Sequence, residues 1–226
     1  VLRFGQARMK QVDDQDSSIV SHLRAGDISP LRSRLLTQAP ALPLAPTRSD
    51  YDLNPDMRPN PARELAQAAV LIPIVLRQTP SIMFTRRNPN LARHAGQVSF
   101  PGGRVETSDV SLVQTALRET QEETGIAPGF VTVAGFLEPY ETGTGYAILP
   151  VVGALAEGFA LLPDANEVDE VFEVPLAFLM EPANRERRSA ELLGRRREFW
   201  AFNYGSHYIW GATAAMVVNF TERLRA

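Results

Sequence analysis

The spacing of three acidic residues constrains the fold of this chain more than any other feature. Glu119, Glu122 and Glu123 stand at positions i, i+3 and i+4, which on an α-helix places three carboxylates on one face within about one turn. Like charges at this spacing repel each other, so the helix gains nothing from them unless a cation lies beside them. The pattern therefore predicts a helix with a cation-binding face.

Glycines stand on both sides of this predicted helix. Gly102 and Gly103 precede it, and a diglycine turn lets the backbone approach a bound group closely. Gly125 follows it, at the position where helices commonly end in a left-handed residue. We expect the helix to span residues 109–124, with Asp109 or the serine before it as the N-cap.

Carboxylates arranged in this way suit a hard divalent cation. Mg²⁺ prefers near-octahedral oxygen coordination and is usually held by a few carboxylates together with substrate phosphate oxygens. A solvated acidic face is the alternative for a lone Glu-Glu pair, but the neighbouring Arg118 and the flanking glycines favour a metal site. The segment predicts Mg²⁺ or Mn²⁺ on Glu119, Glu122 and Glu123, held against a phosphate-bearing substrate.

The stretch from Gly103 to Ile126 resembles the Nudix box, the signature of the Nudix hydrolase superfamily. That signature is Gly, five residues, Glu, seven residues, Arg-Glu, an aliphatic residue, any residue, Glu-Glu, any residue, Gly and an aliphatic residue. The half that begins at Arg118 is intact, apart from Thr120 in place of the first aliphatic residue. In the other half Asp109 replaces Glu, and it is separated from the arginine by eight residues in place of seven.

The segment before the box resembles the coenzyme A pyrophosphatase branch of that family. The match covers residues 85–88 and 94–103, and the extra residue in the box is also usual in that branch. Two positions depart from the branch pattern. Asn88 stands where Ser or Ala is usual, and Ala92 stands where Arg is usual, with Arg93 one place later.

The resemblance implies an enzyme that hydrolyses the pyrophosphate bond of a nucleoside diphosphate linked to another group. In this branch the substrate would be coenzyme A or its thioesters, giving 3′,5′-ADP and 4′-phosphopantetheine. Two alternatives stay open here: a Nudix pyrophosphatase acting on ADP-ribose or another dinucleotide, and a non-catalytic Nudix-fold nucleotide-binding module. The intact set of carboxylates favours an enzyme.

Roles for the box residues also follow from the resemblance. Glu119 and Glu122 would be catalytic as well as metal ligands, because the ion they hold acts on the pyrophosphate. Arg118 would orient a carboxylate of the loop or the helix, with Glu106 as the candidate.

A base that aligns the attacking water is expected outside the box. Glu167 is the first choice, ahead of Glu141 and Glu170. Arginines recognise phosphate by bidentate hydrogen bonds, and glycines shape the turn beside it. The substrate-binding candidates are Arg86, Arg87, Arg93, Gly102 and Gly103.

Hydrophobic patterning predicts an α/β fold for the part of the chain that starts near residue 66. Two helices are expected among the strands, one at the box and one over 211–224. This order favours a Nudix-like α/β/α sandwich with a mixed β-sheet between helices. Strands are predicted at 68–76, 81–86, 97–100, 131–137, 147–155, 170–174, 197–202 and 208–210.

Residues 1–65 differ from this region in composition. A short helix is expected over 28–39, and the stretch from Pro40 to Pro61 holds six prolines and few aliphatic residues. We therefore expect an N-terminal helical and proline-rich extension, residues 1–65, ahead of a Nudix domain, residues 66–226.

Net charge and apolar content argue against nucleic acid and membranes as partners of this chain. A net charge of −3 gives no basic field for nucleic acid, and the arginines of 185–197 alternate with glutamates as on a solvated face. The longest apolar run, 68–76, is too short to span a bilayer. The chain has no cysteine, which excludes disulfides and is compatible with a cytoplasmic location. A small-molecule nucleotide is the expected partner, and the family resemblance adds a homodimer.

Overall fold

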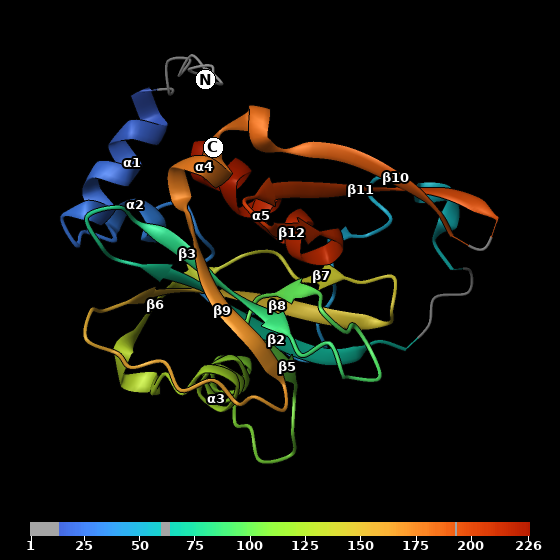
Figure 1. Cartoon of the computed structure of the whole chain (residues 1–226), viewed down its shortest axis with the longest axis horizontal. Helices are drawn as coiled ribbons and strands as arrows, with labels where there is room; N and C mark the ends of the chain where they lie inside the picture. The colour runs from blue at the N-terminus through green and yellow to red at the C-terminus, as the bar shows by residue number, and fades with distance from the viewer. Residues whose placement is uncertain (1–13, 60–63, 193) are drawn as a thin grey trace, which may run out of the picture.

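A mixed β-sheet occupies the centre of the computed structural model, which describes residues 14–59, 64–192 and 194–226 (Figure 1). Within these residues the sheet has nine strands. Its middle is the parallel pair β2 and β8, which are paired along ten residues each. The strands are β1 (Arg48–Ser49), β2 (Ala66–Val75), β3 (Ser81–Arg87), β4 (Val98–Ser99), β5 (Gly102–Arg104), β6 (Val131–Phe136), β7 (Tyr140–Glu141), β8 (Tyr146–Leu155) and β9 (Val168–Pro175).

The remaining elements cover both faces of this sheet. In Figure 1 helix α3 lies below it, and a three-stranded antiparallel sheet, β10–β11–β12, lies above it with α5. These elements are α1 (Asp14–Arg24), α2 (Ser29–Arg32), α3 (Leu112–Thr124), α4 (Leu176–Met180), α5 (Gly211–Arg225), β10 (Glu186–Leu192), β11 (Arg195–Tyr204) and β12 (His207–Trp210). Three short 3₁₀ turns span Pro55–Met57, Pro128–Phe130 and Pro182–Asn184.

Alternation along the strands divides the apolar core into two layers. In β3, Ile82 and Phe84 belong to the cluster that includes Phe220 of α5. Met83, between them, belongs to the cluster that includes Ala116 of α3. Successive strand residues point to opposite faces, so a strand with apolar residues at every position is buried on both sides. The predicted α/β/α sandwich with a mixed sheet is confirmed.

The helix predicted over 28–39 is mostly wrong. Helix α2 ends at Arg32, and Leu36 then forms an isolated bridge to Phe136 of β6. The Leu36 N–H donates to the Phe136 carbonyl at 3.0 Å. Pairing with the sheet therefore ends the helical turn before the proline-rich stretch begins.

Residues 14–59 pack on the rest of the molecule. Ile19 and Leu23 of α1 are buried in the same cluster as Phe220. Asp16 accepts hydrogen bonds from Arg225 near the end of α5, the shortest at 2.5 Å. The division at residue 65 stays a prediction, since these contacts join the two parts.

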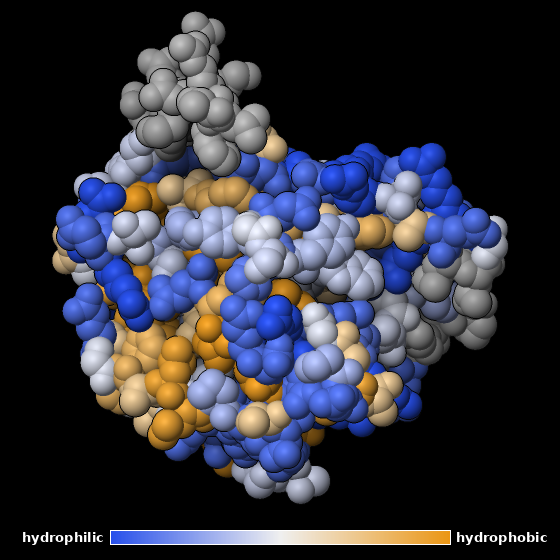
Figure 2. Space-filling view, in the orientation of Figure 1, coloured by the Kyte–Doolittle hydropathy of each residue, from blue (hydrophilic) through white to orange (hydrophobic). Residues whose placement is uncertain are grey.

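The surface shows mixed polarity. On the face in Figure 2 the apolar side chains gather mainly at the lower left, and Leu161 and Leu162 of the segment between β8 and β9 are exposed. Among the described residues, no helix is long and apolar enough to cross a membrane.

Candidate active site

Helix α3 begins and ends with specific caps. The Ser111 hydroxyl accepts a hydrogen bond from the Gln114 N–H at 3.1 Å, which makes Ser111 the N-cap. The predicted start at residue 109 is therefore wrong, because the Asp109 carboxylate is engaged elsewhere. Gly125 ends the helix with φ 78°, as predicted, and a Cβ there would lie 2.8 Å from Cβ of Leu162.

Arg118 holds the loop before α3 through Asp109. Its Nε and Nη2 donate to the two Asp109 oxygens, each at 3.0 Å. The same carboxylate accepts from the Thr115 hydroxyl and from the Glu106 N–H, and its side chain is 1% exposed. The Arg118 guanidinium holds the pKa of Asp109 well below its usual range. Glu106, the expected partner, has its carboxylate 4.0 Å from Arg118, so Asp109 is the loop carboxylate that Arg118 orients.

Replacing Asp109 with Asn is expected to lower the free energy of unfolding by about 2–3 kcal/mol, because it removes the buried charge that accepts from both Nε and Nη2 of Arg118 and puts an amide donor against one of them. The measurement is urea denaturation at pH 7. Glu106→Gln is the matched control; its side chain is 60% exposed, so it should change stability by less than about 0.5 kcal/mol. Equal losses in the two variants would contradict this assignment.

Glu119 lies against the backbone of the diglycine turn. A Cβ on Gly103 would lie 2.3 Å from Oε1 of Glu119, so only glycine leaves room for this carboxylate. Arg118 Nη1 donates to the same oxygen at 3.0 Å. Burial raises the pKa of Glu119, and the charge of Arg118 opposes that rise.

Glu123 is the most deeply buried of the three glutamates. It is 3% exposed, and its Oε2 accepts no hydrogen bond from the residues that the structure describes. Burial raises the pKa of Glu123 to about 8; the positive charge of Arg87 opposes this rise, and the charges of Glu119 and Glu167 add to it. A buried carboxylate oxygen without a donor calls for another partner, and a hard divalent cation satisfies oxygen ligands of this kind.

Glu122 differs from the other two. Its side chain is 57% exposed and accepts from Arg118 Nη1 at 2.9 Å. That nitrogen thus touches both Glu119 and Glu122, which confirms that the helical spacing puts these two on one face. Within the described residues, however, no group of three acidic or histidine side chains is arranged to hold a metal ion. The ligand set Glu119, Glu122 and Glu123 stays a prediction.

The three candidates for the base occupy different surroundings. Glu167 is exposed, and its charge raises the pKa of both Glu119 and Glu123, so it lies near the α3 carboxylates. Glu141 is bound by Arg58 at 2.9 Å. Glu170 is bound by Arg86 and lies 3.1 Å from His207 Nε2. This placement favours Glu167, whose role stays a prediction.

The candidate substrate-binding arginines lie in three different surroundings. Arg86 is paired with Asp169 at 2.7 Å and with Glu170. Arg87 lies within electrostatic range of Glu123, and its Nε is buried without a partner in the described part of the chain. Arg93 is exposed in the loop after β3. Of the three, Arg87 is therefore the one that the structure brings beside the glutamates.

The two candidate glycines bring the backbone of β5 close to the glutamates of α3. The backbone of Gly102 lowers the pKa of Glu123 slightly, against the larger effect of burial. A Cβ on Gly102 would lie 2.5 Å from the carbonyl oxygen of Ala69 in β2. Close pairing with β2 thus requires glycine at this position, independently of any ligand.

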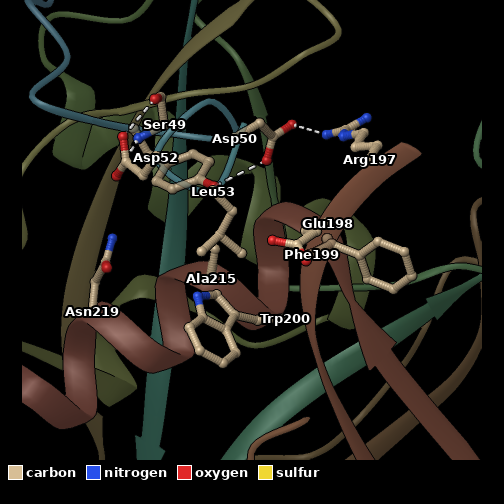
Figure 3. Close-up of a pocket in the computed structure, with 12 residues that line it drawn as sticks. Ser49, Asp50, Asp52, Leu53, Arg197, Glu198, Phe199, Trp200, Ala215 and Asn219 are labelled. Carbon is tan, nitrogen blue, oxygen red and sulfur yellow. Dashed lines mark hydrogen bonds and ion pairs between the residues drawn. The ribbon is translucent and has the colours of Figure 1, made fainter. Parts of the chain in front are cut away.

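Two residues have structural roles that sequence reasoning missed. The His207 ring stacks on Phe172 with ring centroids 3.7 Å apart, which the sequence does not indicate because β9 and β12 are distant along the chain. Asp50 accepts from the Tyr140 hydroxyl, the Gly143 N–H and Arg197. Figure 3 shows Asp50 facing Arg197 beside a small pocket. Its volume of about 30 Å³ has room for roughly one water, so it is no nucleotide site.

Comparison with known proteins places the chain among related sequences. The model of the NUDIX domain matches residues 65–194. The Nudix hydrolase NudL of Pectobacterium atrosepticum is 40% identical over 176 residues, which cover 76% of this chain and 88% of that protein. NudL of Klebsiella pneumoniae strain 342 is 38% identical over 180 residues, which cover 75% and 94%. Neither name states a substrate.

Solved structures show weaker likeness. An Ap4A hydrolase binary complex from C. elegans has a TM-score of 0.42 and 19% identity, over 48% of this chain and 80% of that one. A MutT/nudix family protein from Enterococcus faecalis has a TM-score of 0.48 and 15% identity, over 75% and 66%. Likenesses at these scores add nothing to the sequence matches.

Proposed function

The chain belongs to the Nudix hydrolase family, and we propose that it cleaves the pyrophosphate bond of coenzyme A or its thioesters with the help of Mg²⁺ or Mn²⁺. Members of this family hydrolyse pyrophosphate bonds in small-molecule nucleotides and generally use divalent metal ions; this chain is a Nudix pyrophosphohydrolase. The substrate and the identity of the ion are the proposed parts. Homodimerisation and a cytoplasmic location are proposed on the family resemblance and the absence of cysteine.

One observation carries the metal requirement: the buried Oε2 of Glu123 has no hydrogen-bond donor among the described residues. Glu119 lies in a gap that only a glycine leaves open, and Glu122 is the exposed member of the set. The carboxylate oxygens of these three residues are the donor type that a hard divalent cation prefers, and we propose that they hold it once the side chains converge on the ion. When bound, the ion would polarise the pyrophosphate and lower the pKa of the attacking water.

The chain's own residues would supply positioning and charge. Glu167 would accept the proton of the water whose oxygen attacks phosphorus, while the bond from that phosphorus to the bridging oxygen breaks and the second phosphate leaves. Arg87, whose Nε has no partner among the residues that the structure describes, would place its charge beside the diphosphate. The Arg118–Asp109 pair would hold the loop before α3 against the helix. Hydrolysis of a phosphoanhydride needs mainly such positioning and neutralisation.

The substrate assignment is supported by the signature at 85–88 and 94–103. An open depression of about 580 Å³ lies beside β5 and is lined by Leu42, Leu65, Arg104 and Val105, among others. Its size falls in the range of small-molecule sites, which is compatible with a substrate that has a long second half such as pantetheine.

A second substrate class, ADP-ribose or another dinucleotide, is favoured by Ala92, which stands where the coenzyme A branch usually has Arg. The test is a panel of coenzyme A, acetyl-coenzyme A, ADP-ribose and diadenosine polyphosphates with Mg²⁺ or Mn²⁺, with products identified by mass spectrometry. We expect 3′,5′-ADP from coenzyme A. Turnover of ADP-ribose with none of coenzyme A would remove the first choice.

Glu122→Gln is expected to lower kcat about a hundredfold, because it removes a charged ligand of the ion and leaves the fold intact. The measurement is steady-state hydrolysis with Mg²⁺ varied, together with thermal denaturation. Glu106→Gln is again the control, since it removes a similarly exposed carboxylate from the loop before α3. Wild-type activity in Glu122→Gln would exclude this residue from the ligand set.

A further inference from the structure

We infer that Asn88 is a positioning residue, which clamps the segment carrying Glu167 to the end of β3 and so sets where the Glu167 carboxylate lies relative to α3. This inference rests on the proposed role of Glu167 as the base. It concerns a position at which the chain departs from the branch that it resembles, and no role in the reaction described above uses this side chain.

The segment from Leu162 to Glu167 is first attached to the end of α3. The Leu162 N–H donates to the Thr124 carbonyl at 2.9 Å, and the Asp164 N–H donates to the Glu123 carbonyl at 3.2 Å. These two carbonyls belong to the last turn of α3, and carbonyls in the last turn of a helix have no hydrogen-bond partners within the helix. The segment therefore starts from a fixed point beside the glutamates.

Asn88 supplies the second point of attachment. Its backbone N–H donates to the Glu167 carbonyl at 2.8 Å, and its side-chain amide donates to the Ala165 carbonyl at 2.6 Å. The Oδ1 of the same side chain accepts from the Asn90 N–H at 2.8 Å. One residue thus holds two carbonyls of the Glu167 segment and shapes the start of its own loop.

The Glu167 carboxylate depends on this backbone anchor. Its side chain is exposed and accepts no hydrogen bond within the part of the chain that the structure describes, so nothing but its backbone holds it in place. Its charge nevertheless reaches both Glu119 and Glu123. A displacement of about 1 Å in such a group can cost as much as a hundredfold in rate.

Asparagine suits this position because its side chain is long enough to reach the Ala165 carbonyl and carries both a donor and an acceptor. Serine at this position keeps an acceptor for the Asn90 N–H, but its hydroxyl is too short to replace the amide donor to the Ala165 carbonyl. Alanine loses both bonds. The backbone bond to the Glu167 carbonyl does not depend on the side chain, but the bond to the Ala165 carbonyl does. Since Ser or Ala is usual at this position in the branch, the side-chain half of the clamp is a property of this chain and not of the branch as a whole.

The test is a double-mutant cycle of Asn88→Ser and Glu167→Gln, measured as kcat and KM on coenzyme A with saturating Mg²⁺, or on whichever compound of the panel is hydrolysed. Asn88→Ser is expected to lower kcat about tenfold with little change in KM. In the Glu167→Gln background the same substitution should cost less than about twofold, because the group that it positions is already gone. Asn166→Ser is the matched control, since its amide bonds only Asp164 within the same segment.

A second readout needs no turnover. Amide hydrogen exchange over 162–168, followed by mass spectrometry, should become at least about fivefold faster in Asn88→Ser and stay unchanged in Glu167→Gln. Unchanged exchange in Asn88→Ser, or equal kcat losses in both backgrounds, would overturn the clamp. Full activity of Glu167→Gln would instead refute Glu167 as the base, which is a separate failure, and the exchange result would still decide whether Asn88 holds the segment.

Discussion

Glu123→Gln is expected to lower kcat/KM about a thousandfold and yet to make the metal-free protein more stable at pH 8. The loss of activity follows from removing the buried ligand of the ion. The gain in stability follows from burial, which raises the pKa of Glu123 from its ordinary 4.5 to about 8. Glutamine has no charge to bury, so it avoids that cost.

The raised pKa of Glu123 determines the direction in which the stability of the metal-free protein changes with pH. Because the folded pKa lies above the unfolded one, the contribution of Glu123 to stability is complete below pH 4.5 and is lost as the pH rises to about 8. In that window the unfolding free energy of the wild type should fall by at most about 1.4 kcal/mol per pH unit from this group. Glu123→Gln should lack that slope.

Urea denaturation at pH 5, 6, 7 and 8 with EDTA measures this difference directly. Excess Mg²⁺ should stabilise the wild type at pH 8, since an ion that binds only the folded state raises its stability, and should have little effect on Glu123→Gln. Parallel stability profiles for the two proteins in EDTA would show that Glu123 is ionised in the folded state without cost.

Gly103→Ala is expected to lower kcat by at least about a hundredfold while changing thermal stability little. The new methyl group would meet the Glu119 carboxylate at 2.3 Å, and the end of a flexible side chain moves away at low cost in stability. Gly103 does not have a positive φ, so alanine strains no backbone there. The displaced carboxylate would no longer reach an ion shared with Glu123.

Gly129→Ala is the control for that substitution, because a Cβ at Gly129 meets nothing within 4 Å. Steady-state kinetics and a melting curve for each variant are the measurements. If Gly103→Ala unfolds at a much lower temperature, the contact matters for the fold and not for placing Glu119. If it keeps wild-type kcat, Glu119 has no role in the reaction.

Much of the fold could be predicted because apolar patterning and glycine placement report local structure. The run at 68–76 became β2, and Gly125 ended α3 as expected. The N-cap could not be assigned correctly, since Asp109 is a good cap in isolation and its capture by Arg118 depends on the folded loop. Strand β10 was missed because its charged residues follow no apolar alternation.

The candidate site was partly predictable for the same reason. Helical spacing alone brought Glu119 and Glu122 to one guanidinium. It did not indicate that Arg86 would be occupied by Asp169, because that partner lies 83 residues further along the chain. The contact of Asn88 with Ala165 spans 77 residues and likewise leaves no local signal.

The segment that the family model matches is smaller than the part of the chain that shares its apolar core. Residues 65–194 match the family, but Ile19 and Leu23 before them and Val217 and Phe220 after them complete the apolar layer over β3. An excised homologous segment would present that layer to water. A protein cut back to residues 65–194, or a fusion designed on that segment, would therefore expose one apolar face of its sheet and is expected to aggregate.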